Sequence, residues 1–442
     1  MFKRKMEKVL WDWKCDPDRR PLVVKGPRQC GKTFSVRKFA QENYAHAVFV
    51  DFFEQPETKA AFRGSKRVDD IVMNLTAMVP GATFEPRKTC LVLDEMQECP
   101  EARTALKFFA TDGRFDVVCT GSLLGVRGYG ARDRDVVSPV PVGYETIVEM
   151  TPLDFGEFLR ANGIADEIVG RLRECLDGET PVPEALHRRM EALFLQYVAV
   201  GGMPKAVDVF LQTHDMGKVL RVQRNIVDEY KDDMVKYAAG ADKSRIRECF
   251  ESVPRQLARE NKKFQYAAIR KNARSSEYLG CLQWIEDAGI VARCRNLFAP
   301  ELPLDGNAQE DVFKVYMRDT GLFLSMLEQG TQADVLQGNL LGYKGAIFEN
   351  AVADVFSKMG RKLYYFRKDS GLEVDFVIRH KGKCVLVEVK STTGNVKSTK
   401  TILKNKDVYH VDNAIKLGKY NVGRCGEILT LPLYMAFLLD SP

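Results

Sequence analysis

Eight consecutive residues near the N-terminus have the types and the spacing of a phosphate-binding loop. They match the pattern GxxxxGK followed by Ser or Thr, and they are Gly26, Pro27, Arg28, Gln29, Cys30, Gly31, Lys32 and Thr33. The glycines permit the tight turns by which backbone amides surround phosphate oxygens. Lys32 would place a positive charge on the β- and γ-phosphates, and the Thr33 hydroxyl would ligate Mg²⁺. A strand-like run precedes the loop and a helical run follows it, a context that disfavours a chance glycine turn.

An acidic pair at the end of an apolar run supplies the second half of such a site. The run Cys90–Leu93 predicts a buried strand, and Asp94 and Glu95 follow it directly. Asp94 would reach the magnesium side of the phosphates, and Glu95 could polarise an attacking water as general base. A third strand-like run ends at Thr120, which could sense the γ-phosphate or simply close a turn. These residues predict a site for ATP and Mg²⁺, with Lys32 and Glu95 as its catalytic residues.

A second constellation lies near the C-terminus. Asp375 is part of the strand-like run EVDFVI, and Glu388-Val389-Lys390 follows thirteen residues later. Because side chains alternate along a strand, Glu388 and Lys390 project to the same side. A metal ion held by Asp375 and Glu388 could activate water against a phosphodiester, with Lys390 stabilising the developing charge. Glu349, on a predicted helix upstream, completes this candidate catalytic set. The same pattern in an edge strand can also form a plain surface ion pair.

The first 150 residues alternate short apolar runs with longer helical patterns. This alternation predicts a parallel, doubly wound sheet, in which Thr120 could sit between the phosphate loop and the acidic pair. The predicted strands are Leu22–Lys25, Ala47–Asp51, Cys90–Leu93, Val117–Thr120 and Thr146–Met150.

The middle of the chain, from residue 152 to about residue 330, has mostly helical patterns. Amphipathic stretches occur at Arg188–Val200 and Ile246–Leu257. The string EYLGCLQWIEDAGIVARC resembles a helix followed by the hairpin of a winged helix, a module that can place a helix in the DNA major groove. Ser276–Ala288 carries no ladder of basic side chains, which favours a structural role. The segment Gly201–Pro204 predicts a turn that packs closely against another backbone.

The last hundred residues predict a small α/β domain. One apolar helical face consists of Ile347, Phe348, Ala351, Val352, Val355 and Phe356. Three strand-like runs follow it at Lys362–Arg367, Glu373–Ile378 and Cys384–Val389. The predicted organisation is a P-loop core at 1–150, a helical region at 151–240, a winged-helix-like region at 241–335 and an α/β domain at 336–442.

The composition is that of a globular protein with a real core. Hydrophobic residues make up 45% and charged residues 29% of the 442 residues. The formal charge of +6 permits an anionic partner, and Lys and Arg crowd the C-terminal carboxylates, which suits a DNA or RNA backbone. No apolar run approaches a bilayer span, and the N-terminus does not resemble a signal peptide. The 11 cysteines form no CxxC pair and the five histidines no cluster, so we expect a cytoplasmic protein with free thiols.

Seven strings of residues resemble, in order and spacing, a large prokaryotic family of AAA-type ATPases whose C-terminal domain has no assigned function. They are GPRQCGKT, LVLDEMQ, CTGSLL, PLDFGEFL, YVAVGGMPKAV, FKVYMRDTGL and GAIFENAVADVF. The resemblance covers nearly the whole chain. It implies an α/β protein with an AAA-type core built on a parallel sheet, a mostly helical middle with a winged-helix-like module, and a C-terminal α/β domain similar to PD-(D/E)xK nucleases. It also implies ring-like homo-oligomers, in which a neighbour supplies an arginine.

One position departs from the family pattern. The family usually has a basic residue after the glycine that precedes the PLDFGEFL string, whereas here Gly143 is followed by Tyr144. Arg127, Arg132 and Arg134 are alternative cationic groups, and they can equally be solvated loop charges. The sequence therefore assigns no arginine to the γ-phosphate.

Three functions are consistent with these residues. The leading hypothesis is an ATPase whose nucleotide state controls a nuclease-like domain on DNA or RNA. The second is a nucleotide-controlled switch whose C-terminal domain binds a protein or nucleic-acid partner and cuts nothing. The third is a metal-dependent nuclease with a vestigial ATPase, which the intact Lys32 and Glu95 disfavour. The sequence is also consistent with a monomer or a dimer in place of a ring-like oligomer.

Overall fold

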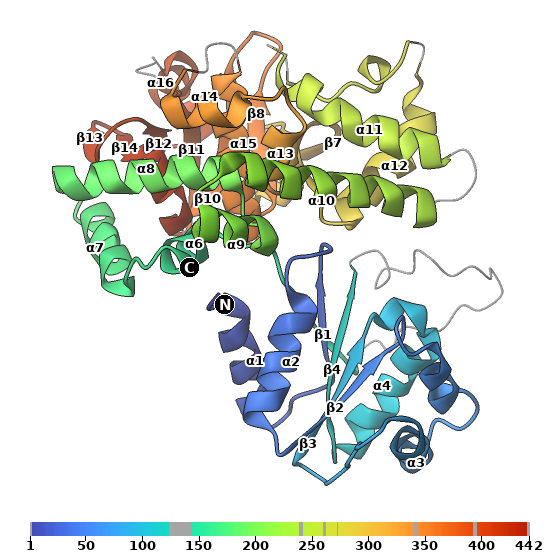
Figure 1. Cartoon of the computed structure of the whole chain (residues 1–442). Helices are drawn as coiled ribbons and strands as arrows, with labels where there is room; N and C mark the ends of the chain where they lie inside the picture. The colour runs from blue at the N-terminus through green and yellow to red at the C-terminus, as the bar shows by residue number, and fades with distance from the viewer. Residues whose placement is uncertain are drawn as a thin grey trace. The chain divides into compact units, whose positions relative to one another are not determined.

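The computed structural model describes residues 2–122, 143–237, 242–259, 262–271, 273–339, 343–391 and 396–439. The chain divides into two compact units, the first containing residues 1–152 and the second nearly all of residues 153–442 (Figure 1). Both units are built from helices and sheets, as predicted for an α/β protein. None of the helices described is long and apolar enough to cross a membrane.

The first unit is a five-stranded sheet between helices. Its strand order is β2-β3-β4-β1-β5, and all neighbouring strands are parallel. The strands are β1 (Leu22–Gly26), β2 (His46–Asp51), β3 (Thr89–Asp94), β4 (Asp116–Ser122) and β5 (Thr146–Glu149). The helices are α1 (Lys5–Cys15), α2 (Lys32–Asn43), α3 (Val68–Met78) and α4 (Pro100–Asp112), with short 3₁₀ turns at Pro56–Phe62 and Met96–Glu98.

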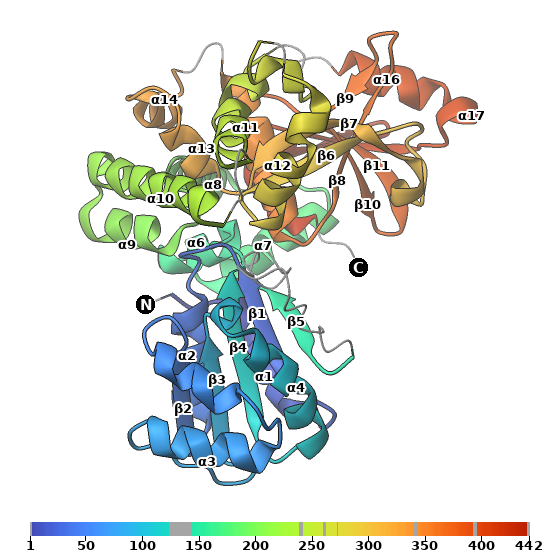
Figure 2. The same cartoon turned by 90° about the vertical axis from the view of Figure 1, so that its right-hand side faces the viewer.

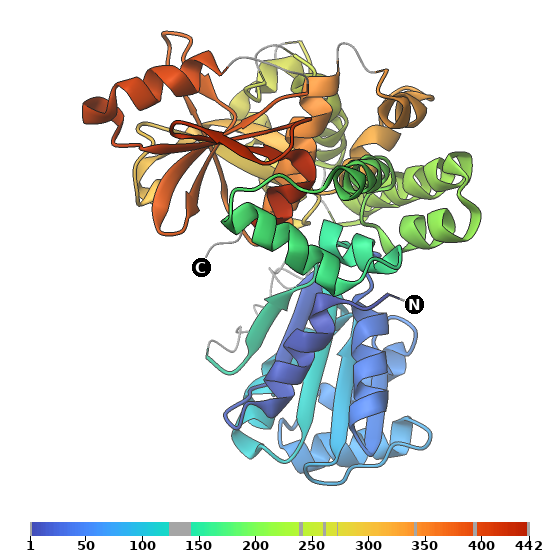
Figure 3. The same cartoon turned by 90° about the vertical axis from the view of Figure 1, so that its left-hand side faces the viewer.

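Successive apolar side chains of this sheet pack into two separate hydrophobic cores, one on each face. Val24 on β1 packs with α1 and α2, whose face is turned to the viewer in Figure 3. The adjacent Val23 packs on the other side with α3 and α4, which face the viewer in Figure 2. Because both faces are covered, the inner strands are continuous apolar runs, whereas the edge strand β5 is largely exposed. All five strands predicted from the sequence are confirmed to within two residues at each end.

The second unit begins with helices and ends with strands. Its helices are α6 (Phe155–Ala161), α7 (Asp166–Asp177), α8 (Glu184–Val200), α9 (Pro204–Thr213), α10 (Met216–Tyr237), α11 (Asp242–Leu257), α12 (Ser275–Asp287), α13 (Thr320–Ser325), α14 (Thr331–Gln337), α15 (Lys344–Lys358), α16 (Lys397–Lys404) and α17 (Lys406–Tyr409). Its strands are β6 (Val291–Leu297), β7 (Ala308–Met317), β8 (Leu363–Arg367), β9 (Glu373–Val374), β10 (Phe376–His380), β11 (Lys383–Val389), β12 (Asn413–Gly418), β13 (Gly423–Cys425) and β14 (Ile428–Pro432). Short 3₁₀ turns lie at Tyr266–Ala268, Leu304–Asn307 and Leu433–Leu438.

Two sheets form the strand-rich part of this unit (Figure 2). One has the order β7-β6-β8-β9 and the other the order β10-β11-β12-β14-β13. The antiparallel hairpin β6–β7 follows α12, as expected of the winged-helix-like region. However, β6 also pairs in parallel with β8, so this sheet crosses the boundary predicted at residue 335. The sequence pattern could not show this, because strand pairing joins residues far apart in the chain.

The predicted strand Glu373–Ile378 is divided in the structure. Its first part, β9, pairs with β8, and its second part, β10, pairs with β11 in the other sheet. Asp375 lies at the break between them. The backbone N–H of Val389 donates to the Asp375 carboxylate at 2.8 Å, so this side chain ties the break to the end of β11.

The turn predicted at Gly201–Pro204 does pack against other backbone. A Cβ on Gly202 would overlap the carbonyl oxygen of Leu153, and a Cβ on Gly201 would overlap the Asp319 carboxylate. Gly201 also has a φ of 74°, a conformation that favours glycine. Only glycine fits at both positions.

Gly202→Ala is expected to destabilise the second unit by about 1–3 kcal/mol, because the added methyl group meets backbone that cannot move aside. Gly170→Ala is the matched control. No atom lies within 4 Å of a Cβ at Gly170, which is inside α7, so this change should stabilise by about 0.5–1 kcal/mol.

Urea unfolding of the full chain measures both changes. Trp284 is the single tryptophan of the second unit, and its fluorescence reports that unit when Trp11 and Trp13 are replaced by Phe in every variant. Equal midpoints for the two alanine variants would contradict the close packing of the turn.

Candidate functional site

The phosphate loop joins β1 to α2 and has the backbone shape that its glycines suggested. Gln29 and Gly31 both adopt positive φ, of 61° and 98°. A Cβ on Gly26 would overlap the carbonyl oxygen of Met150. Cys30 is buried beneath the loop, and its Sγ donates to the same carbonyl at 3.4 Å. The loop therefore lies directly against the chain that follows β5.

Lys32, the first residue of α2, is buried with its ammonium group inside the loop. Its Nζ donates to the carbonyl oxygens of Gly26 at 3.0 Å and Pro27 at 2.9 Å. The ammonium group is thus held where the loop amides and the N-terminus of α2 would meet phosphate oxygens.

Two side-chain hydroxyl groups from two other elements converge on one carboxylate oxygen of Asp94. Asp94 ends β3, and its Oδ1 accepts a hydrogen bond from the Thr33 hydroxyl of α2 at 3.1 Å. The Thr120 hydroxyl of β4 donates to the same oxygen. Mg²⁺ prefers oxygen ligands of this kind, so the pair Thr33 and Asp94 fits a magnesium ion. Thr120 therefore lies beside Asp94.

Glu95 lies one residue beyond the strand in a left-handed conformation, with φ of 51°. Its backbone N–H donates to Asp94 Oδ1 at 3.1 Å. Its carboxylate accepts a hydrogen bond from the Gln97 side-chain amide. The carbonyl oxygen of that amide accepts from the backbone N–H of Ser122, after Thr120 on β4, at 3.3 Å. Gln97 was not selected from the sequence, although its place two residues after Glu95 was a usable signal.

Tyr144 occupies the position at which the family usually has a basic residue, and the ammonium group of a lysine lies over its ring. Tyr144 is partly exposed, and the Nζ of Lys107 lies 5.2 Å from its ring centroid. Arg127, Arg132 and Arg134 lie outside the residues that the structure describes. Tyr144 precedes β5, whose first residue Thr146 pairs with Leu22 at the start of β1, whereas the phosphate loop follows the end of β1. Within this unit, Tyr144 and Lys107 therefore lie at the edge of the sheet opposite the phosphate loop, and Lys107 does not replace a cation at the γ-phosphate.

The C-terminal candidate site is centred on Glu349, which lies on α15. This helix is buried along nearly its whole length, so Glu349 is only 2% exposed. Lys314 donates to its Oε1 at 3.1 Å, and Tyr316 and Lys262 donate to its two oxygens at short range. Burial acts to raise the pKa of Glu349, but Lys314 and Lys262 outweigh it and hold that pKa below the ordinary value.

The other predicted side chains gather near the end of β11. Lys390 Nζ donates to Glu388 Oε2 at 2.6 Å, and the Thr399 hydroxyl of α16 donates to Oε1 at 2.7 Å. Removal from solvent, and then the carboxylates of Glu349 and Glu388, raise the pKa of Asp375 well above its usual range. The three predicted carboxylates therefore lie close enough to influence one another.

Several partners of these carboxylates were missed from the sequence. They are Lys262, Lys314, Tyr316 and Thr399. Lys314 is almost completely buried, and it also contacts Glu373 at 2.9 Å. Within the described part of the chain, no three or more His, Cys, Asp or Glu residues are grouped so as to hold a metal ion. Asp375 and Glu388 remain as a pair that a divalent ion could use together with substrate oxygens.

These observations define the first unit as an AAA-type P-loop domain. Residues 18–159 match the family model of the AAA domain. Residues 191–333 match a domain of unknown function, DUF8612, and residues 344–434 match a second one, DUF4143.

No curated protein sequence matches the chain. Among solved structures, the Walker-type ATPase PABY2304 of Pyrococcus abyssi is 11% identical, with a TM-score of 0.43, and the match covers 74% of this chain and 96% of that one. The Orc1 protein of Aeropyrum pernix, solved in complex with DNA, is 12% identical with a TM-score of 0.28, covering 76% and 91%.

Proposed function

We propose that the first unit hydrolyses ATP with Mg²⁺ and that its nucleotide state controls the carboxylate site of the second unit, which acts on DNA or RNA. The single observation that carries the first half is the convergence of the Thr33 and Thr120 hydroxyl groups on one oxygen of Asp94, with the buried Lys32 next to Thr33 in the chain. A structural strand end would not need three polar groups from three elements at one point.

Each residue of the ATP site has a distinct role in this proposal. The loop amides and Lys32 bind and orient the β- and γ-phosphates. Thr33 and Asp94 would hold Mg²⁺, which neutralises negative charge on the phosphates when bound. Glu95 accepts a proton from the attacking water as that water bonds to the γ-phosphorus. The bond to the ADP oxygen then breaks, and Thr120 is placed to contact the γ-phosphate that leaves.

ATP binding and release of phosphate test this half directly. Lys32→Ala should abolish ATP binding, because it removes the buried cation of the loop. Lys38→Ala, on the same helix, is the matched control, since Lys38 pairs with Glu7 at 3.0 Å away from the loop. Unchanged ATP affinity in Lys32→Ala would contradict the assignment of this loop as a phosphate-binding loop.

Gln97→Ala is expected to lower kcat for ATP about tenfold while leaving ATP affinity unchanged, because the amide orients Glu95 without contacting phosphate. Gln97→Glu keeps the size of the side chain but replaces the donor amide by a carboxylate, and should be at least as slow. Steady-state kinetics with a separate measurement of nucleotide affinity distinguish the two parameters. A rise in KM at constant kcat would assign Gln97 to nucleotide binding instead.

The second half of the proposal rests on the charges around Asp375. Asp375 and Glu388 would hold a divalent metal, which supplies activation of water for phosphodiester hydrolysis when bound. Lys390 is held beside Glu388 and can stabilise negative charge on the phosphate. Lys397, Lys400 and Lys404 are exposed on α16, whose buried Thr399 donates to Glu388. A row of exposed lysines beside the carboxylates suits a nucleic-acid backbone.

A nucleotide-controlled binding switch is the second candidate, and one observation favours it. Both oxygens of Glu349 and both oxygens of Glu388 already accept hydrogen bonds within the protein. A carboxylate site neutralised by its own lysines can bind a partner without catalysing hydrolysis.

Cleavage of labelled single- and double-stranded DNA and RNA separates the candidates. The assay uses Mg²⁺ or Mn²⁺, with and without ATP. Under the nuclease proposal, Asp375→Ala and Lys390→Ala lose cleavage and keep ATP turnover, whereas Asp369→Ala, at an exposed turn, keeps both. Cleavage that survives both active-site changes would place the activity elsewhere. Nucleic-acid binding without cleavage in the unaltered protein would establish the switch.

A further inference from the structure

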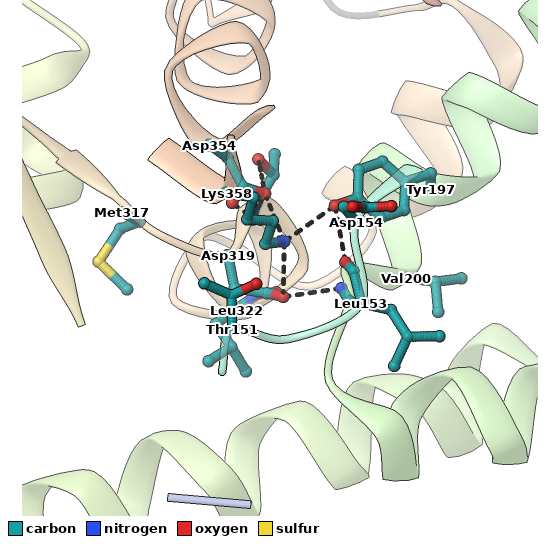
Figure 4. Close-up of polar contacts among 12 residues, drawn as sticks. Thr151, Leu153, Asp154, Tyr197, Val200, Met317, Asp319, Leu322, Asp354 and Lys358 are labelled. Atoms are coloured by element: carbon teal, nitrogen blue, oxygen red, sulfur yellow. Dashed lines mark hydrogen bonds and ion pairs between the residues drawn. The ribbon is translucent and has the colours of Figure 1, made fainter. Parts of the chain in front are cut away.

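A buried ion cluster lies inside the second unit (Figure 4). Lys358 on α15 contacts the two carboxylate oxygens of Asp354 at 3.0 and 3.1 Å and the carboxylate of Asp319 at 3.7 Å. Its ammonium group also donates to the Tyr197 hydroxyl at 2.9 Å. Tyr197, Asp319 and Asp354 are each at most 3% exposed. Burial raises the pKa of Asp354 to about 7, with Lys358 opposing and Asp319 adding to the rise.

This cluster holds the residue at which the second unit begins. The Tyr197 hydroxyl donates to the carbonyl oxygen of Leu153 at 2.9 Å. The backbone N–H of Leu153 donates to the carbonyl oxygen of Gly202 at 2.7 Å. The N–H of Gly202 in turn donates to the Asp319 carboxylate at 2.7 Å. Both backbone groups of Leu153 are therefore connected to the cluster, one directly and one through Gly202.

The elements that contribute to the cluster also build the C-terminal carboxylate site. α15 carries both Glu349 and two members of the cluster. β7 carries two of the groups that donate to Glu349 and leads into Asp319. The Asn350 side chain joins the two elements. Its amide oxygen accepts from the backbone N–H of Met317 at 2.8 Å, and its amide nitrogen donates to the backbone carbonyl oxygen of Met317 at 3.2 Å. α15 and the end of β7 are thus joined by a pair of buried hydrogen bonds.

The residues just before Leu153 are held to the phosphate loop within the first unit. The Arg4 guanidinium donates to the carbonyl oxygens of Cys30, in the loop, at 2.9 Å and of Thr151 at 2.6 Å. The carbonyl oxygen of Met150 accepts from Cys30 Sγ at 3.4 Å. One residue, Pro152, separates this attachment from Leu153.

We propose that Tyr197 and Lys358 are positioning residues that transmit displacement of the connector Met150–Leu153 to α15 and hence to Glu349. The proposal rests on the nucleotide control proposed above and names its route. Pro152 has a fixed φ and restricts the residue before it, so the connector is a stiff link. A nucleotide that shifts the phosphate loop pulls on Met150 and Thr151, and the cluster converts that pull into a shift of α15.

Hydrogen exchange of the full chain, with and without ATP, tests this route independently of any cleavage. We expect ATP to change the exchange rates of α15 amides by about fivefold or more, the lower end of typical allosteric coupling. Tyr197→Phe removes the hydroxyl that joins Lys358 to Leu153 and leaves the ion pairs in place. The ATP-dependent change in α15 should then become clearly smaller, because only the link through Gly202 and Asp319 remains, while ATP affinity and turnover stay unchanged.

Tyr434→Phe is the matched control. It also removes one buried hydroxyl of the second unit, which bonds His187 at 2.9 Å, but it leaves the connector untouched. This variant should keep the full response of α15 to ATP. A purely structural role of Tyr197 would alter exchange equally with and without ATP, and would not reduce the difference between the two conditions.

Pro152→Gly is a second test variant in case Tyr197→Phe does not fold. It loosens the connector without touching the cluster, and it too should diminish the response of α15. An undiminished response in either folded variant overturns the transmission proposal. A response absent from the unaltered protein, although ATP binds and turns over, also overturns it while leaving the ATPase proposal standing. Absence of ATP binding overturns both.

Discussion

Glu95→Gln is expected to lower ATP turnover by about 100-fold or more, the typical contribution of a general base. ATP binding should persist, because Lys32, Thr33 and Asp94 are unchanged. The variant should therefore accumulate bound ATP. Glutamine has nearly the shape of glutamate but cannot take a proton from water, and Gln97 can still donate to its carbonyl oxygen.

Glu98→Gln is the control for this prediction. It makes the same chemical change three residues along, where Glu98 pairs with Lys59 at 3.6 Å, and it should turn over ATP normally. Phosphate release and retention of labelled nucleotide measure the two properties separately. Normal hydrolysis by Glu95→Gln would remove Glu95 from the mechanism, and Asp94 would then be the next candidate.

Lys358→Met is expected to destabilise the second unit by about 3–5 kcal/mol, because it leaves two buried carboxylates without their cation. The side chain of Lys358 is 1% exposed, so water cannot replace the lost ion pairs. Adding Asp354→Asn should recover part of the loss, since it removes one of the stranded charges. Urea unfolding followed by Trp284 fluorescence, in the background without Trp11 and Trp13, measures the change.

Lys362→Met is the matched control, four residues further along. Lys362 pairs with Asp305 at 2.9 Å, but both side chains are more than 60% exposed. Such surface pairs contribute about 0–1 kcal/mol. Similar losses in the two methionine variants would mean that the buried cluster is no more important to stability than a surface pair.

The first unit was largely predictable because its signals are local. A buried parallel strand is a continuous apolar run, and the phosphate loop requires its glycines within a single turn. Gln97 shows the limit of this approach even at short range. It lies two residues from Glu95, but its role depends on the backbone of Ser122, which β4 brings alongside.

The second unit was predictable in its elements and much less in its contacts. Glu349, Asp375, Glu388 and Lys390 were selected as a set, and the structure brings them into electrostatic contact. Their compensating partners were not selected. Lys262 lies 87 residues from Glu349 and Lys314 lies 35 residues from it. From the sequence, a lysine in a strand is expected to be exposed to solvent. Only the structure shows that Lys314 is buried against the Glu349 carboxylate and neutralises it.

The sequence by itself was enough to predict the phosphate loop, the parallel sheet that carries it and the four C-terminal candidate residues, because these predictions depend on patterns within single loops, strands and helices. The tertiary structure decided which groups neutralise Glu349, where the strand breaks at Asp375, and how Leu153 is fixed to α15. These depend on contacts between residues distant in the chain, and such contacts exist only once the apolar faces of the helices and sheets have packed and placed them together.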